Sequence, residues 1–181
     1  MPATWPALIF LDIDGVLNGH DYLAECRSSK IDRHCIHRLN RVLKATGARI
    51  ILSSAWRYMI HGHAMSLDGF SYMLRTHGMI APIDDKPESR IIIDVTCRDE
   101  DIQLRADQVR AAMEARSNNA RYVVVDDLDL GFTDARMPFV QTDGQVGLTD
   151  TDADRIIAML AEPVDDSPCD HRLVNATRKD G

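Results

Sequence analysis

Polar side chains follow several apolar runs of this chain, and their types suit a site that binds a metal ion and a phosphate. Asp12 and Asp14 come directly after the first run, Ser53 follows the second, and Asp126 and Asp127 follow a later one. Carboxylates without histidine or thiolate partners favour a hard cation, and Mg²⁺ is typically held by one or two carboxylates together with water and substrate phosphate. The residue types therefore predict a Mg²⁺ site.

The same set of residues contains what phosphoryl transfer needs. The hydroxyl of Ser53 and the guanidinium of Arg98, which follows a third apolar run, would bind phosphate oxygens, and arginine can do so through two parallel hydrogen bonds. One carboxylate can attack phosphorus, and another can protonate the leaving oxygen and later activate water. This inventory predicts phosphoryl-transfer chemistry, which depends mainly on positioning and charge neutralisation.

The first pair of aspartates permits a second interpretation. Asp14 is followed by Gly15, and Asp-Gly after an apolar strand is also typical of a β-hairpin turn. The context favours a site instead, because charge has no place inside a buried strand and the other apolar runs end in polar residues as well. Carboxyl ends of parallel strands are where open α/β sheets bind their ligands.

The apolar segments alternate with helical patterns, which predicts a parallel sheet covered on both faces. We expect a three-layer, Rossmann-like α/β fold with a mainly parallel five-stranded sheet. Asp32 and Gly47 are suited to cap the first long helix, and Thr149 and Asp152 are suited to begin the last one. The expected strands cover residues 7–11, 48–52, 90–95, 122–125 and 139–141, and the other expected helices lie within 55–80 and over 99–116.

The strand ends resemble the motifs of haloacid dehalogenase (HAD) superfamily phosphohydrolases. The segment Asp12-Ile13-Asp14-Gly15-Val16-Leu17-Asn18 is similar to the first motif, Ile51-Leu52-Ser53-Ser54 to the second, and Val125-Asp126-Asp127 to the fourth. The resemblance spans about residues 7–160, with the motifs in the right order on the right elements. The segments FLDIDGVLN, LSSAWR and VVVDD further resemble those of a capless branch found in RNA-repair and related proteins.

The resemblance implies a role for each motif residue. Asp12 would be the nucleophile and a metal ligand, and Asp14 would be the general acid and base with its backbone carbonyl on the metal. Ser53 would bind the phosphate. Asp126 and Asp127 would complete the metal shell, one of them directly and the other through water.

The third motif and the substrate contacts are less specific. The superfamily places a lysine or arginine near the start of the helix before the fourth motif, and Arg98 fits this position best. Lys86 and Arg105 are the alternatives, and Arg105 is also placed to pair with Asp101 on the helix surface. The candidate substrate contacts are Ser54, Arg57 and Asn18.

These observations predict a Mg²⁺-dependent phosphomonoester hydrolase that forms an aspartyl-phosphate on Asp12. Two alternatives remain: a phosphatase specific for polynucleotide ends, and a non-catalytic module of the same fold that binds a phospho-ligand or metal. A phospho-receiver domain has a similar inventory, but in a different order along the chain. The intervals after the first and second motifs are too short for a large cap, so the site would be open to a small molecule or a polynucleotide end.

Composition sets the remaining expectations. The 181 residues are 45 % hydrophobic and 27 % charged, which is ordinary for a globular protein. We expect a catalytic domain over 1–162 and a flexible tail over 163–181. The net charge of −7 provides no strong field for nucleic acid, and no run reaches the roughly 18 apolar residues of a membrane helix. Four cysteines without CxxC spacing and no secretion signal favour a cytoplasmic protein, while the oligomeric state is not indicated.

Overall fold

The computed structural model describes residues 6–26, 30–82, 86, 89–97, 104–116 and 120–161. Arg98 and the expected tail at 163–181 lie outside the described residues. The elements are β1 (Leu8–Leu11), α1 (His20–Glu25), α2 (Arg33–Thr46), β2 (Arg49–Leu52), α3 (Arg57–His61), α4 (Leu67–Thr76), β3 (Ile92–Val95), α5 (Arg105–Glu114), β4 (Tyr122–Asp126), β5 (Phe139–Gln141) and α6 (Asp150–Ala161).

The strands form one five-stranded sheet in the order β3-β2-β1-β4-β5. Every neighbouring pair is parallel, which confirms the expected α/β class. The chain builds outward from β1 through β2 to β3 and then returns to place β4 on the other side of β1. The strand order therefore reverses between β1 and β4, and ligands of open α/β sheets bind at this kind of switch point.

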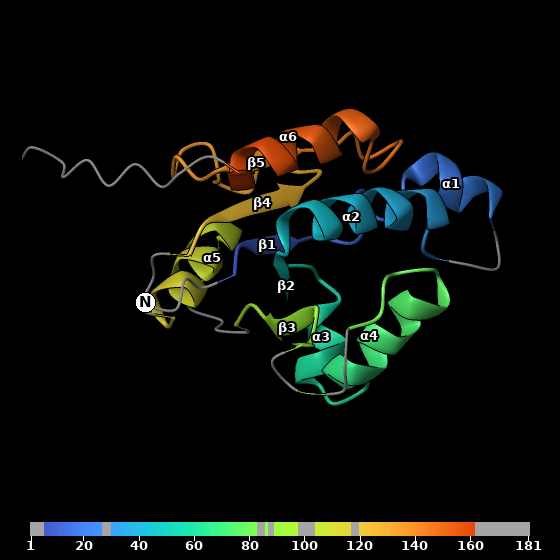
Figure 1. Cartoon of the computed structure of the whole chain (residues 1–181), viewed down its shortest axis with the longest axis horizontal. Helices are drawn as coiled ribbons and strands as arrows, with labels where there is room; N and C mark the ends of the chain where they lie inside the picture. The colour runs from blue at the N-terminus through green and yellow to red at the C-terminus, as the bar shows by residue number, and fades with distance from the viewer. Residues whose placement is uncertain are drawn as a thin grey trace, which may run out of the picture.

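Alternating side chains of the strands supply two apolar cores, one on each face of the sheet. Ile9 and Leu11 of β1 pack into the core that includes α2, α4 and α6, whereas Leu8 and Phe10 pack into the core beneath α5. Figure 1 shows α2 and α6 side by side along one face of the strands. Burial on both faces explains why the strands read as continuous apolar runs.

The long helices begin and end where the sequence predicts. The side chain of Asp32 accepts a hydrogen bond from the backbone N–H of His34 at 2.8 Å, and Gly47 closes α2 in the left-handed conformation with φ of 64°. At the start of α6, Thr149 and Asp152 bond each other's backbone N–H groups, at 3.0 and 3.2 Å. Both ends of α2 and the start of α6 are therefore encoded by local capping.

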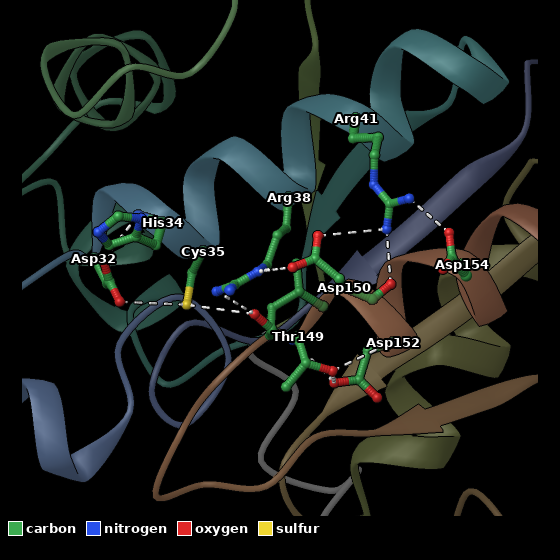
Figure 2. Close-up of polar contacts among 10 residues, drawn as sticks. Asp32, His34, Cys35, Arg38, Arg41, Thr149, Asp150, Asp152 and Asp154 are labelled. Carbon is green, nitrogen blue, oxygen red and sulfur yellow. Dashed lines mark hydrogen bonds and ion pairs between the residues drawn. The ribbon is translucent and has the colours of Figure 1, made fainter.

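Ion pairs join α2 to α6 on the outside of the molecule (Figure 2). Arg38 Nε lies 3.1 Å from Asp150 Oδ2, and Arg41 Nη1 lies 2.6 Å from Asp154 Oδ1. We call these four residues the α2–α6 seam. The seam joins the two helices on the face of the sheet that they cover.

The segment between β2 and β3 holds only the short helices α3 and α4, and α1 is the one helix between β1 and α2 in the described residues. The structure therefore contains no large cap domain in its described part. None of its described helices is long and apolar enough to cross a membrane.

Candidate active site

The switch point brings together carboxylates from β1 and β4. The backbone N–H of Asp12 donates to the carbonyl of Val125 at 2.9 Å, so the chain leaving β1 stays against the end of β4. Asp12, Asp126 and Asp127 each offer a carboxylate oxygen, and these oxygens all lie within 4.8 Å of one another. We call these three residues the carboxylate cluster.

Two glycines, Gly15 and Gly144, make room for the side chain of Asp127. Gly15 has φ of +76°, and a Cβ added there would lie 2.4 Å from Cγ of Asp127. Gly144, from the loop after β5, approaches the same side chain, and its added Cβ would lie 2.7 Å from Oδ2 of Asp127. The Asp-Gly pair of the first motif thus serves close packing around a carboxylate rather than a hairpin.

Burial and mutual repulsion make the ionised cluster costly. Asp12 is 6 % exposed and Asp126 is 1 % exposed. Burial, followed by the charge of Asp126, raises the pKa of Asp12 to about 7, while Arg105 opposes the shift. Burial also raises the pKa of Asp126, again against the opposing effect of Arg105. Both carboxylates can therefore be ionised at neutral pH only when a positive charge lies close to them.

Arg105, the first residue of α5, supplies such a charge. Its Nη1 lies 2.6 Å from Asp126 Oδ2 and 3.2 Å from Asp12 Oδ1. Lys86, the other described alternative for the third motif, lines a separate cavity beside α4 and the start of β3. Among the described residues named for this motif, Arg105 is therefore the one that reaches the carboxylate cluster.

The donor set of the carboxylate cluster fits a hard divalent cation. All three ligands offered are carboxylate oxygens from Asp12, Asp126 and Asp127, without a sulfur or imidazole donor. Carboxylates that repel each other in a buried position are what a small, highly charged ion neutralises. The side chain of Asp14 is not part of this group. The contact expected from the sequence is between the backbone carbonyl of Asp14 and the metal, and it stays a prediction.

Unpartnered polar atoms lie at the ends of β2 and β3 and at the start of α3. The buried hydroxyls of Ser53 and Thr96 and the Nε of Arg57 have no hydrogen-bond partner among the described residues. Arg57 is nevertheless anchored, since its Nη1 donates to the carbonyl of Ser54 at 3.0 Å. Buried donors are rarely left unpaired, so this arrangement is suited to an oxygen-rich ligand such as a phosphate.

Asp14 is held by hydrogen bonds to both of its carboxylate oxygens. The side-chain amide of Asn18 donates to Oδ1 at 2.9 Å, and the indole Nε1–H of Trp56 donates to Oδ2 at 2.9 Å. Asn18 is itself fixed, because the same amide donates to the carbonyl of Lys30 at 2.8 Å. Asp14 is solvent-exposed, in contrast to Asp12, so the two aspartates have different surroundings.

The other candidate substrate contacts, Ser54 and Arg57, are buried next to Asp12. Ser54 is fully buried; its hydroxyl interacts with Asp12 and accepts a hydrogen bond from the backbone N–H of Trp56 at 3.3 Å. Arg57 is 5 % exposed, and its guanidinium is close enough to feel the charges of Asp12 and Arg105. The sequence did not predict the hydrogen bond from Trp56 to Asp14. The only pointer to it was that Trp56 comes shortly after the second motif.

One family comparison covers most of the chain. A family model described as the HAD domain in Swiss Army Knife RNA repair proteins matches residues 8–153. No curated protein and no solved structure matches the chain. The matched span includes the carboxylate cluster, Asp14 and Ser53, together with the strands that position them. The chain therefore belongs to the HAD superfamily, in the family of HAD domains found in Swiss Army Knife RNA repair proteins.

Proposed function

We propose that this protein is a metal-dependent phosphomonoester hydrolase that works through a covalent phosphate on Asp12. One observation carries the proposal: three carboxylates, two of them buried, meet at the switch point, and the buried hydroxyl of Ser53 at the end of the neighbouring strand has no partner among the described residues. Membership of the HAD superfamily supports a phosphohydrolase-type function.

Asp12, Asp126 and Asp127 would hold the metal, and Mg²⁺ is the ion that an all-oxygen site with a substrate phosphate favours. When bound, the ion supplies neutralisation of the negative charge on the cluster and on the phosphate. Ser53 would donate its unpartnered hydroxyl to one phosphate oxygen. Arg105, whose Nη1 lies 3.2 Å from Asp12 Oδ1, would donate to another.

In the first half of the reaction, a carboxylate oxygen of Asp12 attacks phosphorus, and the bond between phosphorus and the leaving oxygen breaks. Asp14 gives its proton to that oxygen, so the product leaves as a neutral alcohol and Asp12 carries the phosphoryl group. The hydrogen bonds from Asn18 and Trp56 hold Asp14 in one orientation for this transfer.

In the second half, Asp14 accepts a proton from water while the water oxygen attacks the phosphorus on Asp12. The bond between phosphorus and the Asp12 oxygen breaks, inorganic phosphate leaves, and both aspartates return to their starting states. The exposure of Asp14 suits this step, since it gives the base access to solvent.

A second candidate narrows the substrate to polynucleotide ends. It is favoured by the family match, whose description refers to RNA repair. The absence of a large cap from the described residues agrees with it, because an open site can admit a polymer. A phosphate-release panel of 3′- and 5′-phosphorylated oligonucleotides, sugar phosphates and phosphopeptides would separate this candidate from a small-molecule phosphatase.

The decisive variant is Asp12→Asn, which keeps the shape of the side chain and removes the nucleophile. We expect turnover of p-nitrophenyl phosphate with Mg²⁺ to fall by about 10³-fold or more, as nucleophile replacements do. The thermal midpoint of the metal-free variant should be no lower than that of the wild type, because a repelled buried charge is removed. In the Asp14→Asn variant, acid quenching should trap a phosphoryl group on Asp12, detectable by mass spectrometry.

The matched control is Asp107→Asn. Asp107 lies on α5, its side chain is partly exposed, and it pairs with Arg110. This substitution should leave turnover unchanged. Metal-dependent activity that survives in Asp12→Asn would refute the proposal, and so would turnover that falls equally in the control.

A further inference from the structure

A cavity of about 540 Å³ opens beside Asp14, and this volume is within the range of small-molecule sites. None of the residues of the carboxylate cluster lines it. The lining side chains that matter here are a carboxylate, three apolar groups, an indole and a lysine: Asp14, Leu23, Met59, Met65, Trp56 and Lys30. The cavity is therefore next to the proposed acid and separate from the proposed nucleophile.

The position of the cavity identifies the part of the substrate that it would receive. An acid that protonates the leaving oxygen lies between the phosphate and the body of the leaving group. A cavity lined by Asp14, but not by Asp12, is therefore on the leaving-group side of the reacting phosphorus. This assignment rests on the proposed function of the two aspartates.

Trp56 is held rigidly at the wall of this cavity. Its Nε1–H donates to Asp14 Oδ2 at 2.9 Å, and its ring packs edge-to-face on Phe70, with ring centroids 6.0 Å apart and an angle of 67°. The residue is only partly buried, so one side of the indole remains available to a ligand. A fixed, partly exposed indole is a stacking surface prepared in advance for a flat ring.

The other lining groups favour an aromatic ring attached to an anion. Met59 and Met65 are both partly exposed, and methionine sulfur makes favourable contacts with aromatic rings. Lys30 is exposed at the same cavity and suits a negative group such as a neighbouring phosphate. A nucleotide combines both features, whereas a sugar phosphate lacks the flat ring.

We propose that this cavity is the leaving-group subsite, that it binds the nucleobase of a phosphorylated nucleotide end, and that Trp56 both forms its wall and orients Asp14. The ring and the N–H of Trp56 thus have different tasks. The ring recognises the base, and the N–H fixes the acid that protonates the leaving oxygen. The two tasks can be separated by substitution.

Binding is measured first, in the Asp12→Asn variant, which holds substrate without turning it over. Isothermal titration calorimetry with Mg²⁺ compares adenosine 3′- and 5′-monophosphate with ribose 5-phosphate. We expect the better nucleotide to bind about 5- to 150-fold more tightly, the range of one base stacked on an aromatic side chain. Adding Met59→Ala and Met65→Ala should reduce this ratio several-fold.

The matched control is Tyr72→Ala in the same background, because Tyr72 is a 63 % exposed aromatic side chain on α4 that does not line the cavity. It should leave the ratio as it was. Equal affinities for nucleotide and ribose phosphate, or a ratio that the methionine variants do not change, would overturn the base-binding assignment.

The second measurement isolates the N–H of Trp56 through Trp56→Phe, which keeps a ring and removes the donor. p-Nitrophenolate leaves without needing a proton, whereas an alkoxide requires one. We therefore expect kcat for a nucleotide or glycerol phosphate to fall about 10-fold further than kcat for p-nitrophenyl phosphate, which corresponds to the loss of one hydrogen bond. Equal losses on all substrates would mean a structural role only and would overturn the positioning assignment.

The proposed function and the subsite proposal can fail independently of each other. If the wild type does not hydrolyse p-nitrophenyl phosphate through Asp12, the proposed function fails, and the calorimetric ratio still decides whether the cavity binds a base. If turnover depends on Asp12 but the ratio is near one, the subsite proposal alone is wrong. Turnover that depends on Asp12 together with a high ratio supports both.

Discussion

Two groups of charged side chains in this protein look alike in sequence and differ in structure. The α2–α6 seam pairs two arginines with two aspartates at the surface, where the side chains of Asp150 and Asp154 are 70 % and 67 % exposed. The active site also pairs an arginine with two aspartates, but there the side chains of Asp12 and Asp126 are 7 % and 1 % exposed. Exposure, rather than the number of pairs, separates the two groups.

The difference extends to hydrogen bonding. In the seam, both terminal nitrogens of Arg41 have partners, although its buried Nε has none among the described residues. Around the ends of β2 and β3, the buried hydroxyls of Ser53 and Thr96 and the Nε of Arg57 at the start of α3 all lack such a partner. Water satisfies and screens an exposed pair, so the seam has little to gain from a ligand. A buried, repelling and incompletely bonded group is unfavourable in the empty protein, and a ligand that pairs with it relieves that cost.

The substitution with the largest expected effect on activity is Arg105→Ala. Removing the guanidinium leaves Asp12 and Asp126 without their cation and deprives the phosphate of a donor, so kcat/KM for p-nitrophenyl phosphate should fall about 10²- to 10³-fold. Metal affinity, measured by calorimetry with Mn²⁺, should not weaken, because a competing positive charge is removed from the carboxylates. Arg105→Lys should recover part of the activity.

Arg110→Ala is the matched control for this experiment. Arg110 lies on the same helix and pairs with Asp107, but its side chain is 50 % exposed. Activity should be unchanged, and stability should change by less than about 0.5 kcal/mol. Comparable losses of activity in the two variants would show that α5 as a whole, and not the charge at the cluster, supports the site.

The second test uses pH, because the ionised cluster should destabilise the metal-free protein. The pKa of Asp12 is raised to about 7 in the folded state, against about 3.9 in an unfolded chain. The folded protein therefore holds a proton between these values that the unfolded chain has lost, and stability falls as pH rises through this window. Between about pH 5.5 and 7.5, Asp12 should remove about 2 kcal/mol from the free energy of unfolding.

Urea unfolding in EDTA measures this dependence, with Asp12→Asn as the reference that lacks the titrating group. The variant should gain stability relative to the wild type as the pH rises, and Mg²⁺ should remove most of the difference by stabilising the wild type. Parallel pH profiles for the two proteins would contradict the raised pKa of Asp12. They would mean that its charge, like the exposed charges of the seam, has little effect on the free energy of unfolding.

Local signals were sufficient to predict most of the fold. The caps Asp32 and Gly47 delimit α2 as expected, and the apolar run at 139–141 forms β5 with the predicted bounds. Within the expected helix at 99–116, the structure describes α5 over Arg105–Glu114, with Leu104 extended before it. The expected start at 99 lies outside the described residues. The alternation of apolar strands and helices determines the parallel sheet because each strand must be covered on both faces.

The site was only partly predictable. Asp126 ends β4, and Asp12, Asp14, Asp127 and Ser53 follow strands, so the sheet alone places them at one edge. Arg105 and Trp56 come from helical segments, and which atoms they reach depends on how these segments pack. The sequence could name Arg105 as an alternative for the third motif, but its contact with Asp126 arises from tertiary structure.

The smallest expected effect is at the α2–α6 seam. It tests whether the exposed ion pairs contribute little to stability and nothing to activity. A double-mutant cycle with Arg41→Ala and Asp154→Ala isolates the pair joined at 2.6 Å, whose side chains are 39 % and 67 % exposed. Urea unfolding should give a coupling of about 0.2–1 kcal/mol that shrinks in high salt, as for other exposed pairs, with turnover unaffected. A coupling of several kcal/mol, or a loss of turnover with either substitution, would mean that exposure does not separate structural from functional charges in this protein.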